Sequence, residues 1–266
     1  MTKARMNMLL ATTAVLALAA CGGGGDGTAA NPTQPPPTTT TTLWESPRGT
    51  GAGLVRASNS ERNYIGLVAD TENPGSIRTS EIIEVISENA FDFGSVSAEY
   101  VVRFSDGEVA NILGTFYDEA AIYANISETR SITAAGGSQV TNMPIGDYSY
   151  RGVAEAWYVR DGVDYSEFGS FDLNANFGNR TATLVADTDF SRYSASGMSI
   201  NNNGEITGSN GIYTTYFNDG TTVADTNNID FFGTLHGSGA THVSGIAVGG
   251  ATTTNDFSSM LIVGKR

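Results

Sequence analysis

Apolar and polar residues alternate strictly from Phe171 to Phe177, where every second position is phenylalanine, leucine or alanine. This period of two is typical of a β-strand with one buried face and one solvated face. Gly178 and Asn179 follow as a predicted two-residue turn, in which glycine at the first position accepts a positive φ. The chain alternates again from Thr181 to Val185. We therefore predict a β-hairpin here.

Similar patterns predict further strands through the second half of the chain. Asn203-Gly204, a strong hairpin signal, and other short turns rich in glycine, asparagine and aspartate separate them. Roughly eight or nine strands with no convincing helix predict an all-β fold, and an eight-stranded antiparallel barrel is the simplest closure because it leaves no unpaired edge. The predicted strands are 148–159, 193–200, 205–208, 212–217, 229–235, 243–248 and 257–263.

The first half of the chain is also mostly β but less regular. The spacing of apolar residues in Ile82–Ile86 suits one face of a helical turn, whereas their β-branched side chains favour a strand, so both assignments stay open. We expect a smaller β-rich region at 43–139 and a barrel domain at 140–266, with Ala134–Ser138 marking the boundary. Other candidate strands are 64–68, 97–104, 109–116 and 122–126.

The N-terminus has the order of a secretory signal. Lys3 and Arg5 precede an apolar run of about 13 residues, shorter than the roughly 20 that a membrane-spanning helix needs. The run ends in small residues before Cys21, the only cysteine of the chain. This junction resembles the lipobox of bacterial lipoproteins and predicts a signal peptide at 1–20 and lipidation of Cys21. The alternative is an ordinary signal peptide with a chance cysteine.

Residues 21–42 are rich in glycine, proline and threonine, which predicts a flexible tether without a core. Gly22 follows the cysteine where an aspartate would resemble an inner-membrane retention signal, so the outer membrane is favoured. The chain carries 14 basic and 28 acidic residues, a net charge of −14. Such a surface repels nucleic acid. With the single cysteine lipidated, no disulfide forms.

Candidate ligand-binding chemistry is sparse. His236 and His242 flank a predicted turn, so both rings could meet at one barrel end and ligate haem iron or a divalent metal. The alternative is two solvated loop histidines. Trp157 and Phe232 fill or girdle the barrel, or contact a partner protein if they point outward. No nucleophile elbow or His-Glu-x-x-His motif occurs, so we predict that the protein is not an enzyme.

The second half also carries a series of aromatic, glycine and alanine positions. It opens with Asp147–Ala154 and continues through Gly169–Asp187, then Phe231–Gly233 before Ala240–Ile246, and closes on Val263–Arg266. This order resembles the barrel domain of transferrin-binding-protein-B-like (Slam-type) surface lipoproteins, over roughly residues 143–266. The resemblance implies an eight-stranded barrel, often preceded by a β-rich handle, with partners bound through loops and handles.

The chain departs from that group near its end. Where such proteins commonly carry Phe-Tyr-Gly before Ala-x-Glu-x-Gly-Gly, it has Phe232-Gly233 and His242–Gly245. The pattern therefore supports the fold better than any ligand. The resulting hypothesis is a lipid-anchored cell-envelope binding protein on the bacterial outer membrane, surface-exposed, which captures a protein or an iron- or haem-type ligand for nutrient uptake or host interaction. The alternative is a structural envelope lipoprotein with no soluble ligand.

Overall fold

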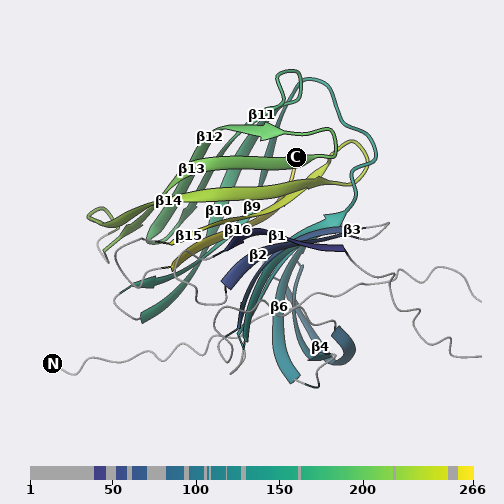
Figure 1. Ribbon diagram of the computed structural model, residues 1–266, viewed down its shortest axis with the longest axis vertical. Helices are drawn as coiled ribbons and strands as arrows, with labels where there is room; N and C mark the ends of the chain where they lie inside the picture. The colour runs from purple at the N-terminus through teal and green to yellow at the C-terminus, as the bar shows by residue number, and fades with distance from the viewer. Residues whose placement is uncertain are drawn as a thin grey trace, which may run out of the picture.

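The computed structural model describes residues 39–45, 52–58, 62–70, 82–92, 96–104, 107, 109–117, 119–126, 130–160, 163–217, 220–250 and 257–266. Their strands form two units, an open sheet of eight strands followed by a closed antiparallel barrel of eight strands (Figure 1). The prediction of an all-β chain with a C-terminal eight-stranded barrel is thus confirmed. The open sheet is called the handle sheet below.

The handle sheet is antiparallel throughout, with the strand order β1-β2-β3-β8-β7-β6-β5-β4. Each strand lies beside its neighbour in the chain except where β8 returns to pair with β3. The strands are β1 (Thr39–Glu45), β2 (Ala52–Ser58), β3 (Arg62–Asp70), β4 (Ile82–Asp92), β5 (Val96–Phe104), β6 (Val109–Tyr117), β7 (Ala120–Ile126) and β8 (Arg130–Ser138).

Three features of this sheet differ from, or settle, the sequence expectations. Ile82–Ile86 belongs to β4, and two register shifts against β5 within these residues explain why their apolar spacing is not a simple alternation. β1 begins at Thr39, inside the range expected for the tether, and its β-branched threonines pair with β2. Ala134–Ser138 is strand, not boundary, because β8 runs to Ser138.

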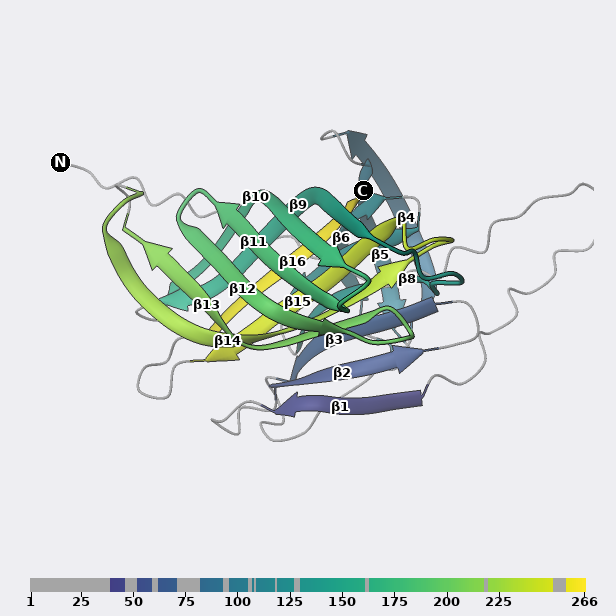
Figure 2. The same ribbon diagram turned by 90° about the horizontal axis from the view of Figure 1, so that it is seen from above.

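The barrel closes in chain order, with the last strand β16 hydrogen-bonded to the first strand β9. Figure 2 shows its tilted strands from above, with the handle strands β1 to β3 along one side. The barrel strands are β9 (Asp147–Arg160), β10 (Val163–Asn176), β11 (Thr181–Thr188), β12 (Ser191–Ile200), β13 (Glu205–Tyr216), β14 (Val223–His236), β15 (His242–Gly250) and β16 (Phe257–Lys265).

Large side chains fill the barrel. Tyr150, Tyr193, Tyr213 and Phe231 are fully buried and point inward among aliphatic residues from all eight strands. The Phe231 ring lies so close to Gly233 that a Cβ there would come within 2.7 Å of it, so glycine makes room for the ring. The described part of the interior is therefore a packed core.

The predicted hairpin between β10 and β11 is present, but its turn is longer than expected. Asn176 pairs with Thr181, so four residues form the loop. The residue with positive φ is Arg180, at 55°, rather than Gly178. At the next predicted hairpin, Gly204 does adopt a positive φ of 77°, which confirms the Asn-Gly signal.

A second buried cluster joins the barrel wall to the handle sheet. Ile246, Val248, Leu261 and Val263 face outward from β15 and β16 and pack against Leu54, Ile65, Ala120, Ile122 and Ala135 of the handle. This explains why β15 and β16 read as nearly continuous apolar runs, since both faces of these strands are buried. The handle sheet thus covers one side of the barrel.

Candidate functional site

The two ends of the barrel differ in their loops. One end consists of residues 139–146 before β9, the loops 177–180 and 201–204, and the turn 237–241, and it is called the open end below. The end called the closed end carries the β11–β12 connection at 189–190 and the opposite tips of the other strands. Because side chains fill the described interior, the loops at the two ends are the parts of the barrel that can contact a ligand.

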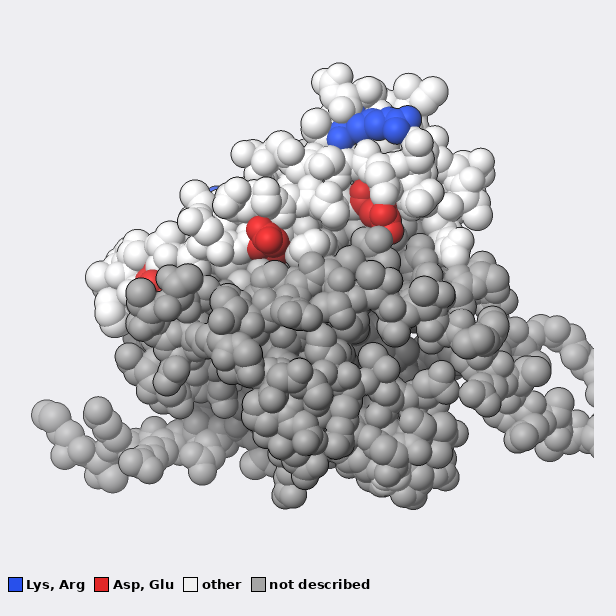
Figure 3. All heavy atoms as spheres, in the orientation of Figure 1, with Lys and Arg blue, Asp and Glu red and all other residues white. Residues whose placement is uncertain are grey.

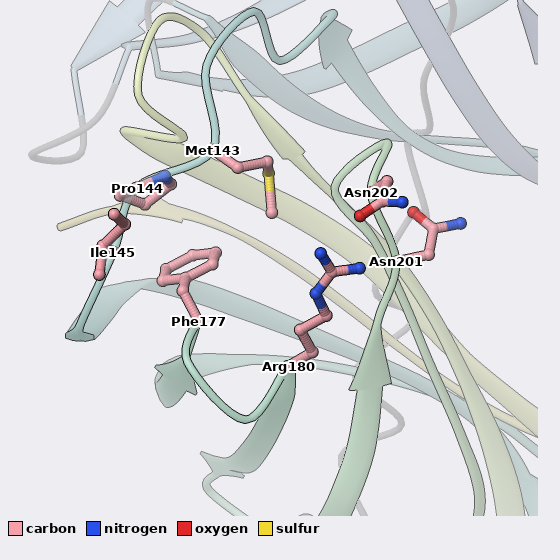
Figure 4. A pocket seen from close by; sticks show the side chains of 7 residues that line it. All are labelled: Met143, Pro144, Ile145, Phe177, Arg180, Asn201 and Asn202. Carbon is pink, nitrogen blue, oxygen red and sulfur yellow. The ribbon is translucent and has the colours of Figure 1, made fainter.

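A cavity of about 240 Å³ lies at the open end, between the segment before β9 and two hairpin loops. Met143, Pro144, Ile145 and Phe177 form its apolar side (Figure 4). Ile145 is 89% exposed, the highest exposure among the large hydrophobic residues that the structure describes. An isoleucine exposed beside a cavity marks a surface suited to an apolar contact.

Arg180, Asn201 and Asn202 form the polar side of the cavity. In Figure 4 the guanidinium of Arg180 is directed into the space between Phe177 and Asn201. The described residues offer Arg180 no salt bridge, whereas Arg151 and Arg192 pair with Asp172 and Asp187 at 2.5 and 2.8 Å. Figure 3 shows acidic and basic side chains of the barrel as small separate patches on the face in view.

Local hydrogen bonds fix the two loops that present these groups. The Asn179 N–H donates to the Asn176 Oδ1 at 2.6 Å, and the Ile200 N–H donates to the Arg180 carbonyl at 2.9 Å. The Asn201 Oδ1 accepts from the backbone N–H of Asn203 at 2.9 Å, as in an Asx turn. The side chain of Arg180 is therefore carried on a backbone held by its neighbours.

At the closed end a hydrogen-bonded network surrounds Glu167, although the buried Thr215 hydroxyl beside it has no hydrogen-bond partner among the described residues. One oxygen of the Glu167 carboxylate accepts from the Tyr158 O–H. The other accepts from the Thr188 O–H at 2.5 Å, the Phe190 N–H at 3.0 Å and the Ser191 O–H at 3.2 Å. This carboxylate thus ties β9, β10 and the β11–β12 connection together.

His236 and His242 lie directly opposite each other on β14 and β15, so the expectation that they share one barrel end agrees with their register. They are not solvated, because both are buried and His236 is fully so. The His236 Nδ1–H donates to the Ser138 carbonyl at 2.8 Å, and its Nε2 accepts from the Ser244 O–H at 2.8 Å. Burial lowers the pKa of His236 to about 4, so the ring is neutral.

These contacts give His236 a structural task, since it joins the barrel to the last residue of β8. Ligating a metal through Nε2 would displace the Ser244 hydrogen bond inside a fully buried site. His242 shares a 2.9 Å hydrogen bond between its Nδ1 and the Thr241 hydroxyl. In the part of the chain that the structure describes, no three histidine, cysteine, aspartate or glutamate side chains gather as metal ligands.

Trp157 and Phe232 point outward from the barrel, as an external contact requires, but they are half-buried against the cluster that joins the barrel to the handle. The Trp157 Nε1–H donates to the Glu155 Oε1 at 2.7 Å. Burial raises the pKa of Glu155 to about 7. The structure therefore brings Trp157 together with Glu155 at the junction with the handle, away from the cavity.

Cys21 lies outside the described residues. Among the residues that are described, none forms a helix long and apolar enough to cross a membrane.

No family model and no curated protein matches the chain. Solved structures of transferrin binding protein B do. The structure from Haemophilus parasuis Hp5 is 12% identical, with a TM-score of 0.49, over 81% of this chain and 51% of that one. The structure from serogroup B Neisseria meningitidis is 9% identical, with a TM-score of 0.43, over 81% of this chain and 66% of that one. The intact protein called Ap-TbpB is 13% identical, with a TM-score of 0.47, over 80% of this chain and 54% of that one.

The likeness agrees with the family resemblance noted in the sequence, and because these TM-scores lie below 0.5, the fold assignment itself rests on the closed barrel and the handle sheet described above. The chain spans between half and two thirds of the length of these proteins. At this identity the likeness concerns the fold alone.

The sequence pattern did not reveal the cavity. Met143 and Pro144 precede the predicted strand 148–159, and Arg180 follows a predicted turn, and neither position by itself indicates a cavity. The one signal that could have pointed to Arg180 is its place in a glycine- and asparagine-rich turn, where a long cationic side chain is unusual.

Proposed function

We propose that this chain is a lipid-anchored protein of the bacterial outer membrane that captures a ligand noncovalently at the open end of its barrel. Three observations support the proposal. The sequence has the pattern of a secretory signal at 1–20 before Cys21, the described barrel is densely packed, and its open end presents loops around a cavity with an apolar and a polar side. Rigid scaffolds that display loops are a common arrangement for recognition.

The single observation that carries the proposal is the pairing of Ile145 and Arg180 at one cavity. An exposed isoleucine and a guanidinium without a salt bridge both gain free energy when a partner covers them. The ligand is a protein, or an iron- or haem-type compound, taken up for nutrition or bound during contact with a host. The haem variant has weaker support, because both ring nitrogens of His236 are occupied.

Capture is tested with the full lipidated chain in detergent, used as bait in host fluid and growth medium. Ile145→Ser should abolish retention of a specific ligand without changing the melting temperature. Ile212→Ser is the matched control, since Ile212 is an exposed isoleucine, 48% accessible, on the barrel wall. Retention that survives Ile145→Ser, or falls equally with Ile212→Ser, would contradict the assignment of the open end.

Two further measurements separate the alternatives. A haem titration followed by absorbance should give a Soret band only if haem is the ligand, and its absence removes that variant. A structural envelope lipoprotein predicts an envelope defect on deletion and no retained ligand. Cys21→Ser should release the protein from the membrane fraction, whereas continued membrane association would argue against the lipid anchor.

A further inference from the structure

We infer that the cavity at the open end binds a small organic carboxylate, with its carboxylate on Arg180 and its apolar body against Met143 and Phe177. The inference goes beyond the proposed function, because it assigns to the same surface a ligand that is neither a protein nor an iron- or haem-type compound. It extends the proposal from capture in general to one chemistry that the residues of the cavity select.

The volume and lining of the cavity indicate the size of the ligand and its apolar character. A cavity of about 240 Å³ suits a compact organic molecule rather than a large cofactor. A methionine, a proline and a phenylalanine line one side, and methionine adapts its shape to an apolar guest. The guest therefore has an apolar part that leaves water when it binds.

The charge of the cavity indicates which polar group the ligand carries. The chain carries a net charge of −14, yet the only ionisable side chain that lines this cavity is the guanidinium of Arg180. Its planar fork of N–H donors matches a carboxylate in bidentate geometry. The neighbouring carboxylate of Glu205 accepts from the Asn201 side chain, so it is held by another partner.

The backbone at Arg180 supports a role for its side chain. A φ of 55° places it in the left-handed region, which glycine and asparagine adopt at lower cost than arginine. Gly178 and Asn179 stand in the same turn with negative φ. In this loop the arginine, rather than the glycine, therefore occupies the position with positive φ. Residues held in such conformations cluster at ligand-binding positions.

The test uses the methyl groups of methionine as local reporters in the full lipidated chain, labelled with ¹³C and studied by NMR. Phenylacetate is the probe, and phenylacetamide is the matched neutral compound with the same apolar body. Phenylacetate should shift the Met143 methyl resonance, assigned with Met143→Leu, in a saturable way. The fully buried Met198 and Met260 should stay unshifted, and this separates cavity binding from global effects.

Arg180→Asn should weaken the phenylacetate affinity by about tenfold or more, since a hydrogen-bonded charge pair is lost. Arg192→Asn removes the same charge from an arginine already paired with Asp187 and should leave the affinity unchanged. The inference is overturned if the Met143 resonance does not move, if phenylacetamide moves it at the same concentrations, or if both arginine variants bind phenylacetate equally.

The two proposals fail in different ways. If phenylacetate leaves Met143 unshifted while Ile145→Ser still abolishes capture, the carboxylate inference is wrong and the capture surface stands. If phenylacetate binds through Arg180 but the bait retains nothing that depends on Ile145, the carboxylate site is supported and the capture proposal fails.

Discussion

Two charged side chains, one at each end of the barrel, differ in their hydrogen-bond partners. At the closed end the carboxylate of Glu167 accepts four hydrogen bonds from side chains and backbone. At the open end the guanidinium of Arg180 has no salt bridge among the described residues and is directed into a cavity. A half-buried carboxylate whose hydrogen bonds are satisfied stabilises the fold, whereas an exposed guanidinium without a salt bridge stays accessible to a ligand.

Removing the closed-end network should have the largest effect on stability. Glu167→Ala leaves the hydroxyls of Tyr158, Thr188 and Ser191 without their acceptor, and we expect the free energy of unfolding to fall by about 2 to 4 kcal/mol. Denaturant titration measures the change. Glu205→Ala at the open end is the control and should cost less than about 1 kcal/mol, because Glu205 accepts from an exposed loop side chain. Equal losses of unfolding free energy in the two variants would show that the two ends do not differ in this respect.

Substitutions at the junction between the barrel and the handle sheet should have an intermediate effect on the free energy of unfolding, and this effect should depend on pH. His236 has a pKa of about 4 in the folded protein and 6.5 as the unperturbed value, so the unfolded chain binds the extra proton between these values. Its contribution to stability is complete above pH 6.5 and is lost as the pH falls toward 4. Glu155, with its pKa raised from 4.5 to about 7, works in the opposite direction, because the folded protein holds the extra proton.

Between pH 4.5 and 6.5 these two contributions cancel in the wild-type protein. In Glu155→Gln only the titration of His236 remains. The free energy of unfolding relative to wild type should therefore drop by about 2 to 3 kcal/mol as the pH falls across this window. His236→Gln should give the reverse slope, with relative stability falling as the pH rises. Unfolding curves at several pH values test both variants. Curves that stay parallel to wild type would show that neither group titrates as a buried one.

The smallest effect is expected at Arg180, and it is a gain. Arg180→Asn replaces a residue that is strained at positive φ with one that tolerates this conformation, so the free energy of unfolding should rise by about 1 kcal/mol. Thermal unfolding measures it, with Arg192→Asn as the control. A loss of stability would mean that the arginine supports the fold, which would remove the contrast with Glu167.

Much of the fold was predictable because it rests on local patterns. Alternation along Phe171–Phe177 correctly assigned the faces of β10, and Asn203-Gly204 correctly located a hairpin turn. The irregular strand β4 was ambiguous, since its two register shifts break the alternation that identifies a strand. The pattern indicated a turn after Phe177 but not its length, which depends on where β11 pairs with β10.

The candidate site was less predictable because it arises from closure of the barrel. Met143, Phe177 and Asn201 stand far apart in the sequence and come together only when alternate strand ends meet at one rim. The burial of His236 likewise depends on β8, which ends almost one hundred residues earlier in the chain. A period of two assigns a residue to a face of a strand, but it does not show what covers that face.

The open margins of the handle sheet have a further consequence. Every barrel strand has two hydrogen-bonded neighbours, whereas β1 and β4 each have one among the described strands. A strand at such a margin presents a row of backbone N–H and C=O groups that another extended segment can pair with. β1 begins with four consecutive threonines, whose side chains favour extended backbone. An additional extended segment can therefore pair with the margins of the handle sheet, whereas the closed barrel offers no unpaired strand.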